Sequence, residues 1–320
     1  MIRYPNFDVL RMFLASEVVF VHSWWTVNKD FQWHAFIMAV PAFLAISGFL
    51  VLQSYEQSGS WRLFIRKRIL RILPALLLSF SICWVLFDLH MLANSFLNWL
   101  TGGLFTMKGP ANGPLWSLAW EELAYSILAL LWIAGAYKRP LVIWGILLIS
   151  AVIISQVTNV KPHTRIIMFL APSFFIGNLM YLYRDKLLKI NGLIPWVMFI
   201  GVIVFRSDIS KFADGLILLM LQAFSVVWVG MSGFNLVRFR FPDISYSMYI
   251  FHMPLLIWIN LNWTIESLPE MLLMLSGFLL SVCLFSWYFV EKPALGFKNR
   301  PNKEFVINSY RRKLAYFFKS

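Results

Sequence analysis

Residues 7–27 read FDVLRMFLASEVVFVHSWWTV, an apolar run interrupted by Arg11, Glu17 and His22. An apolar run of about 17–25 residues is long enough to cross a bilayer as an α-helix. The run has no small-residue cleavage site, and charged side chains inside it are foreign to a signal peptide. We therefore expect this segment to stay in the mature protein as the first membrane span.

The whole chain shares this apolar character. Of its 320 residues 60% are hydrophobic, 18% are aromatic and only 13% are charged, and the mean hydropathy is +0.70. Soluble domains carry about 25% charged residues, and disordered chains lack apolar residues. The composition therefore predicts an all-α bundle in a membrane. Cys83 and Cys283 lie within apolar runs, so we expect neither a disulfide framework nor a metal site.

Apolar runs bounded by proline, glycine, asparagine and charged residues predict about ten transmembrane helices. The predicted spans are 7–27, 35–55, 72–89, 115–137, 141–160, 166–183, 193–205, 212–237, 244–263 and 271–290. We assign residues 1–297 to a single transmembrane domain and residues 298–320 to a basic cytoplasmic tail. Two interpretations of the tail stay open, an amphipathic segment lying on anionic lipid and a solvated tail.

Lysine and arginine residues are unevenly distributed between the segments that connect these spans. With the amino terminus inside, 21 of the 28 fall in cytoplasmic segments and six in external ones, and Arg11 lies within a span. Membrane proteins show this bias toward the cytoplasmic side, which favours an even number of spans with both termini cytoplasmic. The net charge of +13 is scattered between spans instead of forming one stripe, so we expect no nucleic-acid partner.

Arg11 and His22 are predicted to share one face of the first span. Eleven residues correspond to about 1100° of helical rotation, close to three full turns, and to about 16 Å along the axis. A charge at the bilayer centre costs at least about 2.5–3.5 kcal/mol, so a polar groove between helices would explain both residues. The alternative is that Arg11 reaches the lipid headgroups and His22 makes an interhelical contact. Glu17 points elsewhere and is interpreted as a helix–helix contact.

The adjacent acids Glu121 and Glu122 lie about two turns into the fourth predicted span. Neighbouring residues on a helix diverge by about 100°, so one acid is expected to face a cavity and the other a different helix. A histidine beside a carboxylate is held in position as a general base, which makes this pair a candidate partner for His22. The alternative is a buried polar contact that serves only assembly.

Five basic residues precede the third predicted span: Arg62, Arg66, Lys67, Arg68 and Arg71. Such clusters commonly set topology or contact lipid headgroups. Arg68 and Arg71 are three residues apart on one helical face, however, and together would present several donors to a phosphate group. In the ninth span, Tyr249 and His252 are one turn apart, and the sequence leaves open whether His252 is a polar contact or part of a reaction cavity.

Several segments, taken in order, resemble one family, the integral-membrane acyltransferase family 3 of bacteria. They are Asp8-Val9-Leu10-Arg11 with His22; Phe43-Leu44-Ala45-Ile46-Ser47-Gly48-Phe49; Arg68-Ile69-Leu70-Arg71 before Pro74; Leu115-Trp116-Ser117-Leu118 with Glu121, Glu122 and Tyr125; Ser245-Tyr246-Ser247-Met248-Tyr249 with His252; and Val290-Glu291-Lys292-Pro293. Each motif alone is weak, but their order over nearly the whole chain is specific. Val9 stands where glycine is commoner in the family.

The resemblance implies a ten-span protein of the bacterial inner membrane that moves an acyl group, most often acetyl, from acyl-coenzyme A (acyl-CoA) to a hydroxyl group of a cell-envelope or exported polysaccharide. Acyl-CoA is then a co-substrate, with no tightly bound cofactor; the acceptor is a carbohydrate, and the surroundings are membrane lipid. The oligomeric state stays open.

The resemblance also assigns roles to residues. It implies catalytic roles for Arg11, His22 and Glu121 and donor binding by Arg68, Arg71 and the neighbouring Arg66. Substrate contacts are expected from Trp116, Ser117, Glu122, Tyr249 and His252.

The expected mechanism is direct transfer along one hydrated tunnel. Coenzyme A phosphates rest on Arg68 and Arg71, the pantetheine arm passes Arg11, and His22, oriented by Glu121 or Glu122, deprotonates the acceptor hydroxyl. An acyl-histidine intermediate is also open. Two rival functions remain, a transporter of an anionic lipid or sugar-linked substrate and a purely structural membrane protein. Consumption of acyl-CoA by the purified protein would separate these from an acyltransferase.

Overall fold

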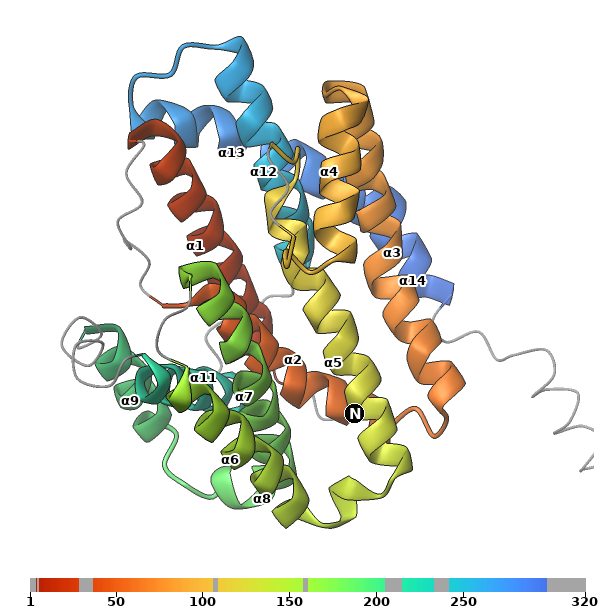
Figure 1. The fold of residues 1–320 in the computed structure, drawn as a ribbon, viewed down its shortest axis with the longest axis vertical. Helices are drawn as coiled ribbons and strands as arrows, with labels where there is room; N and C mark the ends of the chain where they lie inside the picture. Colours follow the sequence, from red (N-terminus) through yellow and green to blue (C-terminus); the bar gives the residue numbers. More distant parts are fainter. Residues whose placement is uncertain are drawn as a thin grey trace, which may run out of the picture.

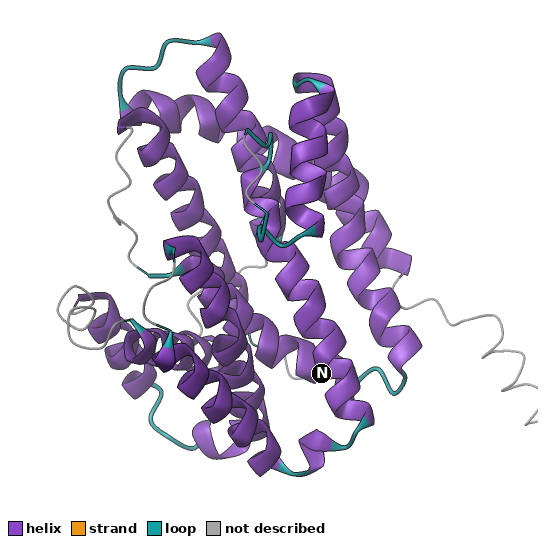
Figure 2. Ribbon diagram, viewed as in Figure 1, coloured by secondary structure: helices purple, strands orange, loops and turns teal. Residues whose placement is uncertain are grey.

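The computed structural model describes Tyr4 and residues 6–28, 37–105, 109–157, 161–204, 215–232 and 242–297. Within these ranges the chain is helical and forms no strand (Figure 2). The predicted all-α fold is therefore confirmed for the described residues, and the predicted tail 298–320 lies outside them. The elements are α1 Asn6–Asn28, α2 Ala39–Glu56, α3 Trp61–Leu86, α4 Leu89–Leu100, η1 Gly113–Leu115, α5 Trp116–Ile133, η2 Ala136–Lys138, α6 Pro140–Gln156, α7 Pro162–Leu182, α8 Arg184–Leu187, α9 Leu193–Val204, α11 Leu216–Met231, α12 Ser245–Asn262, α13 Leu268–Phe285, η3 Ser286–Glu291 and α14 Lys292–Gly296.

The helices differ in whether their length and apolar character would allow them to cross a membrane. Among the described residues, four helical stretches are long and apolar enough to cross a membrane: Ala39–Glu56, Trp61–Leu86, His163–Leu182 and Leu268–Gly296. The helices α6, α9 and α11 are apolar but shorter. Polar groups inside α1 lower its mean hydropathy, although it has 23 residues. The fold is that of a helical membrane protein, and the number of ten spans stays a prediction.

Two elements differ from the predicted spans. Helix α3 begins at Trp61 and not near residue 72, because the Ser60 side chain caps it by accepting the Leu63 N–H at 3.2 Å. The basic cluster is therefore the first part of a helix and not a loop. Helix α4, which is capped by Asp88, was not predicted, since its 12 residues are too few to span a bilayer.

Helix α1 runs from the upper left edge of the view in Figure 1 toward the middle of the bundle. It contacts α2, α11, α12 and α13. Helices α3, α4 and α5 pack together on one side, and α6, α7, α9 and α11 on the other (Figure 1). The side chain of Asn112, just before η1, is fully buried and donates to the Ile250 carbonyl of α12 at 2.8 Å and to Ser79 Oγ of α3 at 3.0 Å. These bonds fix the start of α5 against α3 and α12.

The closest helix pair, α2 with α7, depends on two glycines. A Cβ atom added to Gly48 would lie 2.2 Å from the Phe174 carbonyl oxygen, and one added to Gly177 would lie 2.0 Å from the Ala45 carbonyl oxygen. Small residues allow such close backbone approach in membrane helices. The pair therefore holds α2, which carries part of the site described below, directly against α7.

We expect Gly177→Ala to destabilise the protein by about 1–3 kcal/mol, because the new methyl group must push two helix backbones apart. Gly145→Ala is the matched control: no atom outside its own helix backbone lies within 4 Å of the added Cβ, and alanine is the better helix former. Thermal unfolding of the purified protein in detergent should show a lower melting temperature for Gly177→Ala only. Equal melting temperatures for the two variants would contradict this packing.

Candidate functional site

Two adjoining cavities lie between the helices. The larger, which we call the histidine cavity, has a volume of about 970 Å³ and is lined by His22 and His163. The smaller, the arginine cavity, has a volume of about 310 Å³ and is lined by Arg11, Arg68 and Arg71. Val40 and Tyr249 line both cavities. The polar side chains of α1 therefore do face cavities, and the two cavities meet at Tyr249.

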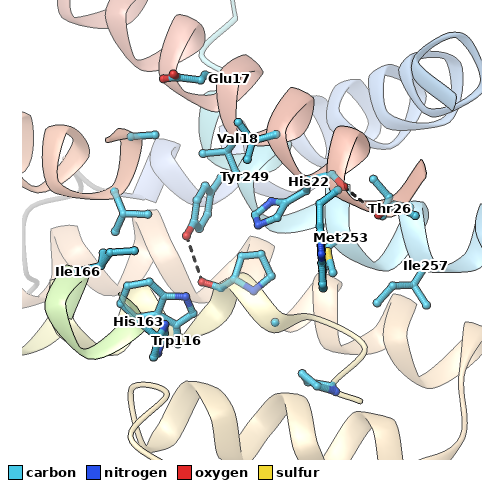
Figure 3. A pocket seen from close by; sticks show the side chains of 18 of the residues that line it. Glu17, Val18, His22, Thr26, Trp116, His163, Ile166, Tyr249, Met253 and Ile257 are labelled. Atoms are coloured by element: carbon cyan, nitrogen blue, oxygen red, sulfur yellow. Dashed lines mark hydrogen bonds between the residues drawn. The ribbon is translucent and has the colours of Figure 1, made fainter. Parts of the chain in front are cut away.

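Residues of six helices, α1, α2, α4, α5, α7 and α12, line the histidine cavity. Figure 3 shows His22 of α1 and Tyr249 of α12 near one another, with Trp116 of α5 and His163 of α7 on the other side. The Trp116 and His163 rings meet edge to face with centroids 4.6 Å apart. Most of the remaining lining is apolar, so the reactive groups at this space are the two imidazoles, the tyrosine hydroxyl, the Glu17 carboxylate and the Thr26 hydroxyl.

The polar partner of His22 is a second histidine. Nδ1 of His22 lies 2.9 Å from Nε2 of His252. The two rings are nearly parallel, with centroids 5.0 Å apart. His252 is 0% exposed, and its Nδ1 lies 2.8 Å from the Tyr249 carbonyl oxygen and 3.2 Å from that of Met248. One side of the His22 ring is thus fixed by α12, and His22 itself lines the cavity.

Tyr249 is held rigidly between the two cavities. Its hydroxyl group lies 2.7 Å from Ser117 Oγ and donates to the Pro114 carbonyl oxygen at 3.1 Å (Figure 3). Ser117 Oγ also donates to Pro114 at 3.2 Å. Because Asn112 fastens the same segment to α12, these bonds lock the start of α5 to the tyrosine. The hydrogen-bonded side chain of Tyr249 therefore lies between the two cavities, and substrate groups in either cavity can contact it.

In the arginine cavity, two guanidinium groups share one carboxylate oxygen. Oδ2 of Asp243 lies 3.1 Å from Nη2 of Arg11 and 2.6 Å from Nη2 of Arg71. Arg11 also pairs with Asp8 at 2.8 Å. Burial by itself raises the pKa of Asp243, but Arg11 and Arg71 beside it hold that pKa well below its usual range. Asp243 is therefore ionised at neutral pH and joins α1, α3 and the segment before α12.

Glu291 adds a further acid beside Arg71. Its carboxylate is 2% exposed and accepts hydrogen bonds from Ser247 and, at 3.0 Å, from Ser286. Its Oε2 lies 3.9 Å from Nη1 of Arg71. Glu291 ends η3, a π-helical turn, and π-turns occur frequently at functional sites. The charge of Arg71 is thus balanced by two carboxylates.

Arg68 is the least neutralised arginine of this cavity. Its Nη2 donates to Ser54 Oγ at 3.1 Å, and its guanidinium carbon lies 5.7 Å from the centroid of the Tyr125 ring. No carboxylate of the described residues lies within ion-pair distance of it, and its buried Nε has no hydrogen-bond partner among them. Glu121, also in this cavity, accepts hydrogen bonds from Ser47 at 2.6 Å and from Tyr125.

The structure brings together most of the predicted site residues. Arg11, Arg68, Arg71, Ser117 and Glu121 line the arginine cavity, Trp116 and His22 line the histidine cavity, and Tyr249 lines both. His252 touches His22 from behind and lines neither.

Three expectations differ from what is seen. His22 pairs with His252 and not with Glu121 or Glu122, because Glu121 is bonded to Ser47 and Tyr125 in the other cavity. Glu122 lies on a different face of α5 and lines a third cavity between α3, α4 and α5, which shares Arg68 and Tyr125 with the arginine cavity. Arg66 donates to the Phe297 carbonyl at 3.0 Å and lines neither cavity.

Glu17 was expected to make a helix–helix contact and to point away from the polar groove. It is buried, and its Oε1 accepts the backbone N–H of Ile37, which precedes α2, at 2.8 Å, but it also lines the histidine cavity with His22. Sequence reasoning missed Asp243 and His163. The signal for Asp243 was available, because Arg11 and Arg71 within a membrane require counter-charges and few acids lie near the cytoplasmic ends of the spans. His163 follows a predicted loop and had no distinguishing spacing.

Known proteins resemble this chain over most of its length. The chain matches the model of a family described as an acyltransferase domain over residues 4–291. Nodulation protein 10 of Rhizobium leguminosarum bv. viciae is 27% identical, and the alignment covers 91% of this chain and 93% of that protein. A protein of Shigella phage Sf6 named O-acetyl transferase is 28% identical, with 89% of this chain and 94% of that protein covered. No solved structure matches the chain.

The family model covers nearly the whole chain. The residues that line the histidine and arginine cavities, from Arg11 to Leu261, all fall inside the matched range, as does His252. The resemblance expected from the motifs is confirmed, and this chain belongs to acyltransferase family 3.

Proposed function

We propose that this acyltransferase moves an acetyl group from acetyl-CoA to a hydroxyl group of a cell-envelope or exported polysaccharide. The observation that carries the proposal is the contact at Tyr249 between a cavity containing His22 and a cavity containing arginines. Acyl transfer to a hydroxyl needs a base at the acceptor and cationic groups for a phosphate-rich donor. The name of the phage relative, O-acetyl transferase, supports the choice of acetyl and of oxygen as the acceptor atom.

The donor is proposed to enter from the arginine cavity. Arg11 and Arg71 are paired with Asp243, whereas Arg68 carries a guanidinium with donors that no described carboxylate neutralises. Arg68 is therefore the strongest candidate to contact a phosphate group of coenzyme A. The pantetheine arm then passes Tyr249, so that the thioester reaches the histidine cavity.

The acceptor is proposed to occupy the histidine cavity. Its volume of about 970 Å³ lies in the range of pockets for drug-sized ligands, and Trp116 offers an aromatic face to a sugar ring. His22 accepts the proton of the acceptor hydroxyl as its oxygen attacks the thioester carbonyl. The carbon–sulfur bond breaks, and the coenzyme A thiolate leaves with the proton that His22 returns. Attack by His22 itself is the alternative covalent route.

We also propose ten spans, with both termini on the cytoplasmic side of a bacterial inner membrane. The ion pairs between Arg11, Arg71 and Asp243 support this topology, since the three residues lie near segment ends that the charge bias assigns to the cytoplasm. The contact of His22 with His252 is at the same time consistent with a shared depth for the outer halves of α1 and α12.

His22→Ala is expected to lower acetyl transfer by at least about 10²-fold, the usual contribution of a general base, while leaving membrane insertion intact. The measurement is incorporation of [1-¹⁴C]acetyl from acetyl-CoA into the endogenous acceptor of native membranes. His90→Ala is the control, because His90 is exposed on α4 and lines neither cavity. Near-normal acetyl transfer by His22→Ala would show that His22 is not the general base.

Arg68→Gln is expected to raise the KM for acetyl-CoA about 10–100-fold, because a charge-assisted hydrogen bond contributes about 1.5–3 kcal/mol. The kcat should change much less. Arg62→Gln, on the exposed side of the same helix, should leave the KM within about twofold, since exposed charges are screened by water and salt. Initial rates at varied acetyl-CoA provide the test, and an unchanged KM for Arg68→Gln would place the phosphates elsewhere.

A further inference from the structure

We propose that His252 is a positioning residue that fixes the tautomer of His22 and directs Nε2 of His22 at the acceptor hydroxyl. This inference rests on the proposed function. It gives His252 a role different from the substrate contact expected from the sequence, because a side chain that is fully buried and lines neither cavity cannot touch a bound substrate.

The protonation of His252 follows from its backbone contacts. Nδ1 of His252 lies 2.8 Å from the carbonyl oxygen of Tyr249 and 3.2 Å from that of Met248. A carbonyl oxygen only accepts hydrogen bonds, so Nδ1 must carry the proton. Among the described residues no carboxylate pairs with His252, and a fully buried imidazolium without one would be costly, so the ring is neutral. Its Nε2 therefore presents a lone pair toward α1.

The protonation of His22 follows in turn. The only ring nitrogen of His252 that faces His22 is an acceptor, so Nδ1 of His22, 2.9 Å away, must be the donor. In a neutral His22 ring, the proton on Nδ1 leaves Nε2 as the basic nitrogen. Since His22 lines the histidine cavity, this is the nitrogen available to a hydroxyl group there. The two backbone carbonyls of α12 thus determine, through His252, which nitrogen atom of His22 acts as the base.

The pair serves the reaction as well as the resting state. When Nε2 of His22 takes the acceptor proton, the ring becomes cationic, and its Nδ1–H bond to Nε2 of His252 becomes a charge-assisted hydrogen bond. The same proton leaves from Nε2 to the coenzyme A thiolate, so both histidines return to their initial state. His252 therefore takes the place that a carboxylate occupies beside histidine in hydrolase triads, which orients the ring and supports its charged form.

The tautomers can be observed directly by NMR spectroscopy. The chain has five histidines, so the ¹⁵N spectrum of protein labelled at histidine and reconstituted in lipid nanodiscs can be assigned with single His→Ala variants. We expect both His22 and His252 to carry their proton on Nδ1, the opposite of the Nε2–H form that free imidazole side chains favour in water. A proton on Nε2 of either residue overturns the inference.

Kinetics of paired variants test the role in catalysis. His252→Leu removes the acceptor and should lower kcat for [1-¹⁴C]acetyl transfer in native membranes by at least about 10²-fold, with the KM for acetyl-CoA within about threefold. His252→Gln, whose side-chain oxygen still accepts the His22 Nδ1–H, should stay within about tenfold of the wild-type kcat. His90→Leu is the matched control on α4. The yield and elution profile in detergent show whether a variant folds. If His252→Leu does not fold, the ¹⁵N spectrum of the wild-type protein alone tests the inference.

A double variant distinguishes positioning from packing. If His252 acts only through His22, His22→Ala with His252→Leu should be no slower than His22→Ala alone, whereas independent effects would multiply. If the losses of activity from the two substitutions multiply in the double variant, the inference is wrong and the proposed function still stands. The same conclusion follows if His252→Leu has a normal kcat while His22→Ala is inactive. A wild-type protein that transfers no acetyl group from acetyl-CoA, or an active His22→Ala, would instead overturn the proposed function and the catalytic meaning of the pair together.

Discussion

The carboxylate of Asp243, shared by Arg11 and Arg71, is the constraint on which the site depends. Two guanidinium groups beside one point of a helical bundle repel each other, and a single carboxylate oxygen at 3.1 and 2.6 Å attracts both. The contact joins α1 and α3 to the segment before α12. With these helices in register, His22 on α1 and His252 on α12 arrive at the same depth, and the arginine and histidine cavities adjoin at Tyr249.

The consequence is a division of electrostatic character along the bundle. The arginine cavity holds charged groups that are mostly paired, with Arg68 the exception, and the histidine cavity holds two imidazoles and the Glu17 carboxylate among mainly apolar and aromatic side chains. In the proposed reaction, the first environment suits a phosphate-bearing donor and the second suits the reacting thioester and hydroxyl group.

The sequence predicts the class of fold and the residues of the site better than it predicts their pairing. Helical rotation places Arg11 and His22 on one face of α1, and both face cavities. Pairing across helices depends on relative rotation and depth, which periodicity does not report, so the partner of His22 was expected to be an acid and is His252. Helix α4 was missed because its 12 residues resemble a loop between longer spans.

In the proposed reaction the donor binds in the arginine cavity, near segment ends that the charge bias assigns to the cytoplasm, and the acceptor binds in the histidine cavity, between the outer halves of the helices. The measurement that tests this direction of transfer supplies [1-¹⁴C]acetyl-CoA, which does not cross the bilayer, to the outside of membrane vesicles of known orientation. Labelling is expected in inside-out vesicles only, with the label protected from an added esterase that acts on the outer vesicle surface. Equal labelling in right-side-out vesicles, or label removed by that esterase in the inside-out vesicles, would contradict this direction of transfer.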